Sequence, residues 1–316
     1  MPATAHRNCS APGHSAGPAA ALAARLSAAA VVRPDEVLAR RTTLRVGGPA
    51  DVYVEPASEA DLAATLQFCA EGGRPFFLLG RGSNLLVRDG GFRGVVICLA
   101  QPAFAQVETQ GQRLHCGAGA KLKLVAQEAR RHALAGLEFL EGIPGSVGGA
   151  LRMNAGAMGG ATFDLVESMR VMDYSGQART LARAEVPVEY RCCPLLRDHI
   201  ALGAVFCGQP GERAQIERRL NEFNRLRWEI QPAAPSAGCT FKNPLSIPAG
   251  RLIDELGLKG TRVGGARVAL EHGNFIVNDG GGTAADVLAL MELVRARARD
   301  ERGLELENEV EIIGED

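Results

Sequence analysis

The sequence has no long hydrophobic run and no excess of charge of either sign, and each absence excludes a class of protein. The longest apolar stretches, such as 287–294, are far shorter than the roughly 18 residues that a membrane-spanning helix needs. Lys and Arg number 35 against 36 for Asp and Glu, so a formal net charge of -1 gives no bulk attraction to nucleic acid. We therefore expect no membrane and no nucleic-acid partner, although a local basic pocket stays open.

The sequence also lacks a signal peptide, a metal motif and a disulfide framework. Its eight cysteines form no CxxC pair and no metal-like spacing with the six histidines, which favours reduced thiols in a cytoplasmic protein and no metal site. Arg25 interrupts the apolar stretch 19–32 and spoils the hydrophobic region of a secretion signal. We expect residues 1–34 to form a flexible tail.

What remains is typical of a globular protein with a sizeable core. The chain has 316 residues, of which 46% are hydrophobic and 22% charged, and this length predicts two domains. Apolar alternation and turn signals predict strands at 50–55, 75–79, 94–99, 114–118, 169–174, 178–181, 186–188, 202–206, 275–278 and 304–313. Helices are expected to start at the caps Ser58 and Thr283 and to cover 121–132 and 212–228. This irregular alternation favours an α+β fold.

Glycine is the most unusual component of the sequence. There are 38 glycines in 316 residues, against about 7% in average usage, and they cluster in short loops. Leu79–Leu85 (LGRGSNL) follows a predicted buried strand, and Gly142–Gly149 (GIPGSVGG) is a second such loop. Successive backbone N–H groups in loops of this kind bind anions, and the missing Cβ atoms let a pyrophosphate approach. Two such loops together with 154–156 favour a dinucleotide site over two ordinary turns, and neither loop spells the GxGxxG of a Rossmann fold.

Three further residues have both an ordinary structural interpretation and a functional one. Arg191 follows a predicted strand and would ordinarily be a surface salt-bridge partner. Cys239, in PSAGCTFKNP, would ordinarily be a small buried hydrophobe. Glu309 falls on the polar face of the predicted strand 304–313 and would ordinarily face solvent. On spacing and composition alone, the ordinary structural interpretation is favoured for each.

A resemblance to a known family changes that weighing. From about Thr42 to Gly314 the chain resembles the UDP-N-acetylenolpyruvoylglucosamine reductases, flavoenzymes of bacterial peptidoglycan synthesis. The matching strings, in the order of the family, are TTLRVGGPAD, LGRGSNLLVRDGGFRGVVI, GLEFLEGIPGSVGGALRMNAGA, the YR of 189–191, PSAGCTFKNP, AGRLIDELGLKG, HGNFIVN and NEVEIIG. Their length and order make chance a poor explanation.

The resemblance implies a domain plan and a cofactor site. An FAD-binding domain of the vanillyl-alcohol-oxidase type would cover 35–208, with subdomains of about 35–100 and 101–208, and a substrate-binding domain would cover 212–316. The last strand, 304–313, would bring Glu309 to the active site. The implied cofactor-binding residues are Arg45, Gly47, Gly48, Gly80, Arg81, Gly82, Ser83, Asn84, Leu85, Gly142, Ile143, Pro144, Gly145, Ser146, Gly148, Gly149, Asn154, Ala155 and Gly156.

The implied reaction is the reduction of UDP-N-acetylglucosamine enolpyruvate with NADPH through FAD. Its catalytic residues fall on Arg191, Cys239 and Glu309, where cysteine stands in place of the serine that most members use as proton donor. Hydride addition leaves negative charge next to a carboxylate, which a planar guanidinium stabilises well, and Glu309 would orient Arg191 or donate a hydrogen bond. An ordinary thiol, with a pKa of about 8.5, is protonated at neutral pH, so activity is expected to fall at alkaline pH. Ser236 is a badly placed substitute donor.

The remaining implications concern the substrate and the rival interpretations. The UDP diphosphate requires cations, and the candidates are Arg227, Lys242 and Lys259, with surface solvation as the alternative for Arg227 and Lys259. Asn243 is expected as a polar contact, and Tyr190 as a further substrate-binding residue. The short stretch between Arg191 and Gly211 favours the shorter family type, without an extra Tyr loop, and we expect a monomer. Departures at Ile230 and Ala269–Phe275 make nearby substrate contacts less certain. The rivals are an FAD oxidase of the same fold and a degenerate flavin or nucleotide-sugar binding protein in which Cys239 marks lost function.

Overall fold

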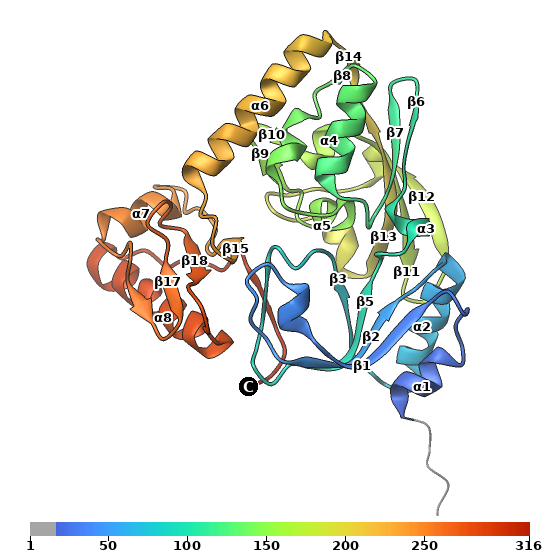
Figure 1. The fold of residues 1–316 in the computed structure, drawn as a ribbon, viewed down its shortest axis with the longest axis horizontal. Helices are drawn as coiled ribbons and strands as arrows, with labels where there is room; N and C mark the ends of the chain where they lie inside the picture. Colours follow the sequence, from blue (N-terminus) through green and yellow to red (C-terminus); the bar gives the residue numbers. More distant parts are fainter. Residues whose placement is uncertain (1–16) are drawn as a thin grey trace, which may run out of the picture.

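The computed structural model describes residues 17–316, which form three units, each built on its own sheet (Figure 1). The first sheet has the order β1-β2-β5-β3, with β1 antiparallel to β2 and the other neighbours parallel. Two helices and a short 3-10 segment accompany it. The bounds are α1 Pro18–Ala23, β1 Val31–Val37, a 3-10 turn Leu38–Arg41, β2 Pro49–Glu55, α2 Glu59–Glu71, β3 Phe76–Leu79 and β5 Phe92–Cys98.

The second unit contains a five-stranded antiparallel sheet of order β12-β11-β13-β7-β6. The strands predicted at 169–174, 178–181 and 202–206 are in this sheet, but the predicted meander is wrong, because β11 lies between β12 and β13. The strands of the sheet are β6 Val107–Gln110, β7 Arg113–Gly117, β11 Val166–Asp173, β12 Ala178–Ala182 and β13 His199–Cys207. Its helices are α3 Pro102–Ala105, α4 Leu122–Arg131, α5 Val147–Arg152 and α6 Arg213–Ile230. The small pairs are β8 Leu134–Ala135 with β14 Gln209–Pro210 and β9 Gly156–Ala157 with β10 Gly160–Ala161, and 3-10 turns lie at Glu138–Gly142, Thr162–Asp164, Arg183–Glu185 and Pro194–Arg197.

The third unit has a four-stranded sheet of order β15-β18-β17-β16 with two helices. Its elements are β15 Ser236–Cys239, α7 Ala249–Glu255, β16 Arg262–Val263, β17 Ala266–Val268, β18 Phe275–Asn278 and α8 Ala284–Arg302. Thr283 caps α8, because its hydroxyl accepts a hydrogen bond from the N–H of Asp286 and the Asp286 carboxylate accepts one in return. Gly303, with φ of 63°, ends the helix in the left-handed conformation that glycine adopts without strain.

The last strand leaves this unit and returns to the first. Strand β19 (Glu311–Ile313) pairs in parallel with β4 (Leu85–Val87), directly after the first Gly-rich loop. Asn84 extends the junction, because its amide donates to the carbonyl of Glu309 at 3.0 Å and its own carbonyl accepts from the N–H of Glu311. The first Gly-rich loop and the segment that carries Glu309 are therefore held side by side.

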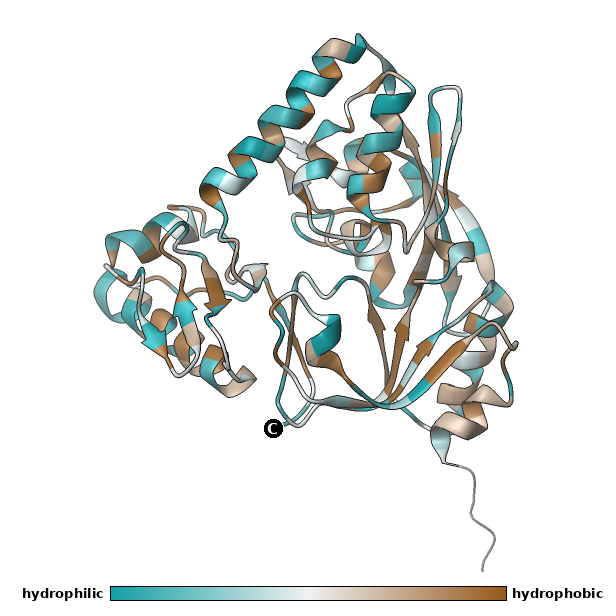
Figure 2. Cartoon of the chain, in the orientation of Figure 1, coloured by the Kyte–Doolittle hydropathy of each residue, from teal (hydrophilic) through white to brown (hydrophobic). Residues whose placement is uncertain are grey.

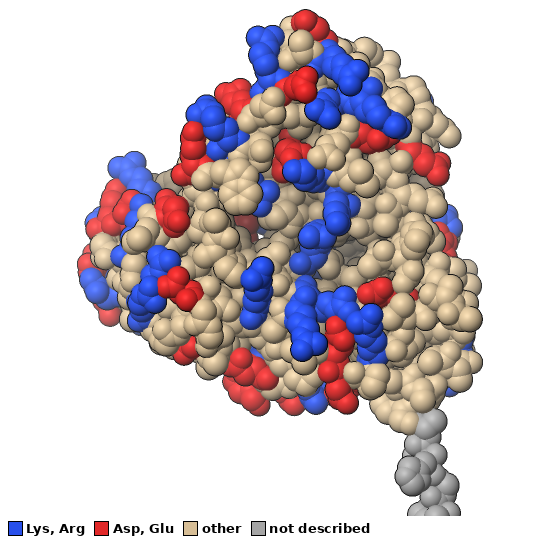
Figure 3. Space-filling model, viewed as in Figure 1, with Lys and Arg blue, Asp and Glu red and all other residues tan. Residues whose placement is uncertain are grey.

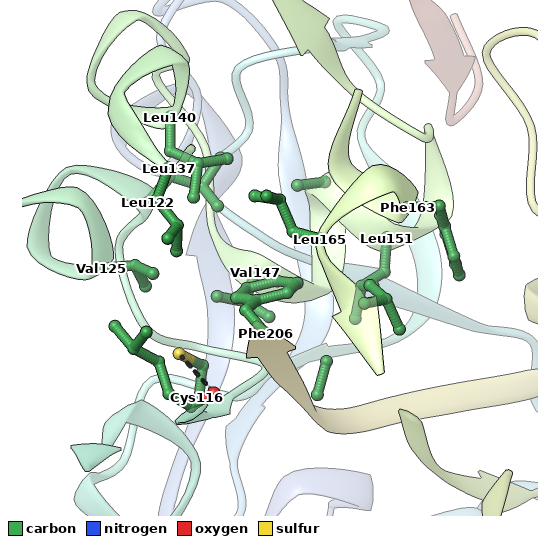
Figure 4. Packing of buried hydrophobic residues seen from close by; sticks show 14 of the residues in the cluster. Cys116, Leu122, Val125, Leu137, Leu140, Val147, Leu151, Phe163, Leu165 and Phe206 are labelled. Carbon is green, nitrogen blue, oxygen red and sulfur yellow. Dashed lines mark hydrogen bonds between the residues drawn. The ribbon is translucent and has the colours of Figure 1, made fainter. Parts of the chain in front are cut away.

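The apolar clusters join the units as well as filling them, since one cluster combines the first sheet with Met172 and Ile200 of the second. Helix α6 belongs to the main cluster of the second unit. In Figure 4, Val147 and Leu151 of α5 pack against Phe206 of β13, with side chains of α4 on the other side. Ile216 and Leu220 of α6 are buried in the same cluster. Figure 2 shows the contrast between the largely hydrophilic exposed surface of α6 and the hydrophobic strands of the sheets.

The structure differs from other sequence-based expectations as well. The predicted tail is too long, because α1 and β1 are formed within it and Leu22 of α1 is fully buried; residues 1–16 lie outside the described residues. Helix α6, which we assigned to the substrate-binding domain, packs on the second unit instead. The predicted strand at 186–188 is not formed. The predicted strand at 304–313 is shorter than expected, because only 311–313 form a strand. Apolar alternation indicates burial, but only pairing with a neighbour makes a strand.

No helix among residues 17–316 combines the length and the apolar character that a membrane crossing requires.

Candidate active site

Two adjoining cavities lie where the three units meet, with volumes of about 750 and 760 Å³. They share part of their lining, including Thr42, Gly80, Arg81, Ser146 and Gly149. The first cavity extends over β3, α4 and β13, and the second extends toward β15 and the C-terminal end of α6. The shared lining makes them adjoining parts of one larger space.

The two Gly-rich loops form the shared wall. The first follows β3, and a Cβ on Gly82, whose φ is +61°, would lie 2.5 Å from the carbonyl oxygen of Arg41. Only glycine therefore allows this loop to lie against the segment 41–43. A Cβ on Gly80 would come within 3.0 Å of the hydroxyl of Ser146, so the two loops touch each other. Ser146 caps α5 by accepting from the N–H of Gly149 at 3.4 Å.

Most of the predicted cofactor residues line these cavities. The lining includes Arg45, Gly80, Arg81, Gly82, Ser83, Asn84, Leu85, Gly142, Ile143, Pro144, Gly145, Ser146, Gly148, Gly149, Ala155 and Gly156. Gly47, Gly48 and Asn154 are not among the lining residues. A Cβ on Gly48 would lie 2.1 Å from the carbonyl of Asp89, so Gly48 serves the packing of the chain. The side-chain amide of Asn154 hydrogen-bonds to the backbone instead. Its oxygen accepts from the N–H of Phe163 at 3.2 Å, and its NH2 donates to the carbonyl of Glu189 at 3.4 Å.

The lining of the first cavity is strongly basic. It carries Arg40, Arg41, Arg81, Lys121, Lys123 and Arg152, while Glu55 is its sole carboxylate. Figure 3 shows Lys and Arg side chains crossing the hollowed face between the units. Backbone that approaches closely and an excess of cations suit a pyrophosphate, so the residues present fit FAD. Of these six cations only Arg81 was predicted as a cofactor contact, although the basic run RR at 40–41 was a visible signal.

Arg191, Cys239 and Glu309 come together in the second cavity, although they are far apart in the sequence. The Nε of Arg191 lies 3.0 Å from Oε1 of Glu309, and the two side chains are 23% and 13% exposed. The Nε–H is not aligned for a hydrogen bond with this carboxylate, so the ion pair is an electrostatic contact without a hydrogen bond. Glu309, for which solvent exposure was the default, is therefore largely buried.

The backbone around Arg191 is strained. Arg191 has φ of 56°, in the left-handed region that non-glycine residues seldom adopt. It lies in a tight turn in which the N–H of Glu189 donates to the carbonyl of Cys192 at 2.9 Å. Such strain persists only where the surroundings enforce it and is commonly found at functional sites. The turn directs the guanidinium toward Glu309.

Burial shifts the pKa of both ionisable groups near Arg191, the Cys239 thiol and the Glu309 carboxyl. Burial, reinforced by the nearby Glu309 carboxylate, raises the pKa of the Cys239 thiol to about 12. Burial also raises the pKa of Glu309, although Arg191 and Lys242 oppose that shift. Low dielectric disfavours the charged forms, so the thiol stays protonated over the whole physiological range. Ser236, three residues before Cys239, also lines the cavity.

Of the five predicted substrate contacts, Arg227 alone is among the residues that line the cavities. Lys242 pairs with Glu307 at 3.0 Å, and Lys259 pairs with Asp254 at 2.7 Å. The other two are occupied or exposed. The Asn243 amide oxygen accepts from the N–H of Ala249 at the start of α7, and Tyr190 is 62% exposed beside Arg191. Sequence reasoning missed Trp228, which lines the second cavity.

Comparison with known proteins gives a consistent result. Residues 231–313 match the model of the C-terminal domain of UDP-N-acetylenolpyruvoylglucosamine reductase, and residues 50–182 match an FAD binding domain. The chain is 42% identical to the UDP-N-acetylenolpyruvoylglucosamine reductase of Clostridium novyi over 87% of its length and 90% of the relative. The corresponding protein of Heliobacterium modesticaldum is 46% identical, with coverage of 89% and 90%.

A solved structure agrees with these matches. UDP-N-acetylenolpyruvylglucosamine reductase from Thermus caldophilus superimposes with a TM-score of 0.77 at 40% identity, covering 90% of this chain and 98% of that one. The predicted α+β fold, with an FAD-binding domain followed by a distinct C-terminal domain, is thereby confirmed.

Proposed function

This chain belongs to the UDP-N-acetylenolpyruvoylglucosamine reductase family, and we propose that it reduces UDP-N-acetylglucosamine enolpyruvate to UDP-N-acetylmuramate with NADPH, for peptidoglycan precursor synthesis. The observation that carries the proposal is the cluster of Arg191, Cys239 and Glu309 in a cavity that adjoins the Gly-rich, basic cavity. The match of residues 231–313 to the family's C-terminal domain disfavours an FAD oxidase of the same fold.

FAD, when bound, accepts hydride from NADPH and supplies it to the terminal carbon of the enolpyruvyl group. The chain's own contribution is to hold the cofactor with the two Gly-rich loops. The cations Arg81 and Lys121 of the first cavity neutralise pyrophosphate charge, and the glycines admit the backbone to close approach. The lining that the two cavities share supports a cofactor position beside the catalytic cluster.

Arg191 stabilises the negative charge that hydride addition leaves next to the substrate carboxylate. A planar guanidinium in a partly dry site binds a carboxylate through two hydrogen bonds, which a Lys ammonium cannot match. Its Nε is the atom that faces Glu309, which leaves the terminal NH2 groups for the substrate. Glu309 holds the guanidinium at 3.0 Å and counters part of its charge.

Cys239 delivers the proton. The thiol S–H bond breaks as the new C–H bond forms at the carbon next to the carboxylate, and the thiolate left behind is reprotonated from water. Because burial raises the pKa of Cys239 to about 12, the donor form is fully populated at neutral pH. The alkaline loss of activity that an ordinary thiol would give is therefore moved to higher pH.

The proposal is tested by the visible absorption spectrum of the protein, reduced anaerobically with NADPH and then mixed with UDP-N-acetylglucosamine enolpyruvate. We expect an oxidised-flavin band that bleaches with NADPH and returns on addition of the enolpyruvyl substrate. A band that bleaches but never returns would contradict the assigned substrate and favour the degenerate binding protein. The absence of any flavin band after reconstitution with FAD would contradict the cofactor assignment.

A further inference from the structure

Trp228 occupies a position that the proposed chemistry does not yet use. It is the single tryptophan of the chain, it lies in the last turn of α6, and it is 57% exposed. Other apolar residues of α6 pack into the cluster of the second unit, namely Ile216, Leu220 and Phe223. Trp228 instead lines the second cavity, where it leaves a large aromatic surface in contact with water. An aromatic face on a cavity wall is placed to stack against a planar ligand group.

The indole is held in a fixed orientation. Its Nε1 donates a hydrogen bond to Oδ1 of Asn224, one helical turn earlier, at 3.1 Å. The polar edge of the ring is therefore satisfied within the helix, and the ring needs no solvent contact for that purpose. What remains available is an aromatic face, which binds by stacking.

The preceding residue supplies a cation at the same place. The guanidinium carbon of Arg227 lies 5.2 Å from the centroid of the Trp228 ring, and Arg227 also lines the cavity. Its Nε is buried without a hydrogen-bond partner, and no ion pair to Arg227 occurs within residues 17–316. Burial lowers the pKa of Arg227, and the nearby Glu141 carboxylate offsets only part of this shift, so the guanidinium is partly desolvated. A buried donor without a partner is costly and points to a ligand that supplies one.

The neighbouring cation of the same helix shows what an ordinary residue looks like. Arg225 is 63% exposed and pairs with Glu229, four residues on, at 2.6 Å. That pair is a solvated helix-surface contact of small energetic effect. Arg227 differs from it in burial, in its missing acidic partner and in its place on the cavity wall.

We propose that Trp228 and Arg227 form a clamp for a nucleoside diphosphate, in which the base stacks on the indole and the diphosphate contacts the guanidinium. This inference rests on the proposed function, since both the UDP-sugar substrate and the reduced nicotinamide dinucleotide carry such a group. Stacking is tolerant of base identity because every base has a π-face, and an adjacent Arg strengthens it. The reacting end of the ligand would then extend toward Arg191 and Cys239 in the same cavity.

The single tryptophan makes the clamp directly observable. Tryptophan fluorescence of the FAD-loaded protein, excited where uracil does not absorb, is titrated with UDP and separately with ADP. We expect saturable quenching. Quenching by UDP assigns the clamp to the substrate, and quenching by ADP alone assigns it to the nicotinamide dinucleotide. Quenching by neither nucleotide overturns the proposal.

Variants separate the base from the phosphate contribution. Trp228→Ala is expected to raise the KM of the clamped reactant about tenfold, equivalent to about 1.4 kcal/mol, with kcat nearly unchanged, while Trp228→Phe restores much of the affinity. Arg227→Ala should abolish the UDP- or ADP-induced quenching with Trp228 still present. Arg225→Ala is the matched control and should leave quenching and KM unchanged. If Trp228→Ala leaves KM unaltered, the proposed clamp is wrong. If the flavin of that variant is still reoxidised by the enolpyruvyl substrate, the proposed function stands.

Discussion

The two cavities are built by different means. The wall that they share, which serves the cofactor, is made largely of backbone from two contiguous Gly-rich segments that lie against each other. The catalytic cluster is made of three side chains, each from a different segment: a strained turn, a short strand and the approach to the last strand. A site built from backbone can be recognised in a sequence, because it requires a local cluster of glycines. Side-chain sites depend on long-range placement and carry almost no local signature.

The comparison predicts that single side-chain deletions will damage the cluster far more than the cofactor wall. The largest effect is expected for Cys239→Ala, which removes the proton donor. Flavin reoxidation by the enolpyruvyl substrate should slow about 10²- to 10⁴-fold, the usual range for general acid catalysis. Rapid-mixing absorbance of the NADPH-reduced protein measures this step.

Two controls sharpen that result. Cys239→Ser should roughly preserve the rate, because it restores a donor of similar size, and flavin content and bleaching by NADPH should be normal in both variants. Near-full turnover in Cys239→Ala would show that the proton comes from elsewhere, with Ser236→Ala the next variant to measure.

The second effect in size is expected for Arg191→Ala. Loss of a preorganised cation aimed at developing charge costs about 10²- to 10³-fold in kcat. Arg191→Lys should recover only part of this, since an ammonium lacks the planar fork. Because Arg191 lines only the second cavity, FAD affinity measured by fluorescence titration should change little. A large loss of FAD affinity would break the separation between the two regions.

The third expectation concerns pH. The protonated thiol is the active form, and the pKa of Cys239 is raised to about 12, so its deprotonation begins only well above neutral pH. The rate of flavin reoxidation should therefore stay level through about pH 10, where a thiol with a pKa of about 8.5 would have lost about 30-fold. A stopped-flow pH series measures it, with Cys239→Ser as the control that lacks a titrating thiol. A midpoint near the ordinary thiol pKa would show that the cluster is open to solvent during catalysis.

The fourth expectation tests the backbone wall. Gly82→Ala places a side chain at φ +61° and 2.5 Å from the Arg41 carbonyl, so we expect a loss of about 1–3 kcal/mol of stability and weaker FAD retention. The matched control is Gly73→Ala, which has φ of +56° but nothing within 4 Å of the added Cβ and lies away from both cavities. Thermal melts and flavin content compare them. Equal behaviour of the two variants would refute the close approach of the loop.

The smallest effect is expected at the joint between the regions. Asn84→Ala removes the hydrogen bond to the Glu309 carbonyl at 3.0 Å, which is worth about 1 kcal/mol. The variant should show modest losses in both FAD affinity and flavin reoxidation, because Asn84 belongs to the first Gly-rich loop and holds the segment of Glu309. Thr283→Ala, which removes the cap of α8 far from the cavities, is the control for general destabilisation. Loss of only one of the two properties would show that the regions are uncoupled there.

Prediction from sequence follows the same division. The Gly-rich loops, the helix caps Ser58 and Thr283 and several strands of the second sheet could be predicted because local composition determines them, whereas the order of those strands could not. Arg191, Cys239 and Glu309 were selected through family resemblance, since on spacing alone each had a more ordinary interpretation. Lys242, Lys259 and Asn243 were expected at the substrate, yet the structure gives each a partner within its own unit. No local pattern distinguishes a cation that faces a cavity from one that pairs on the surface.

The pairing of β19 with β4 has a consequence for the order in which the molecule assembles. Asn84 and Glu309 meet although they are 225 positions apart in the sequence, so closing this contact has an entropic cost and belongs late in folding. During synthesis the first Gly-rich loop emerges long before the strand that seals it. The cofactor-binding wall is therefore open while the chain is still growing, and the catalytic carboxylate joins it last. The complete catalytic site is therefore present only in chains in which β19 has paired with β4.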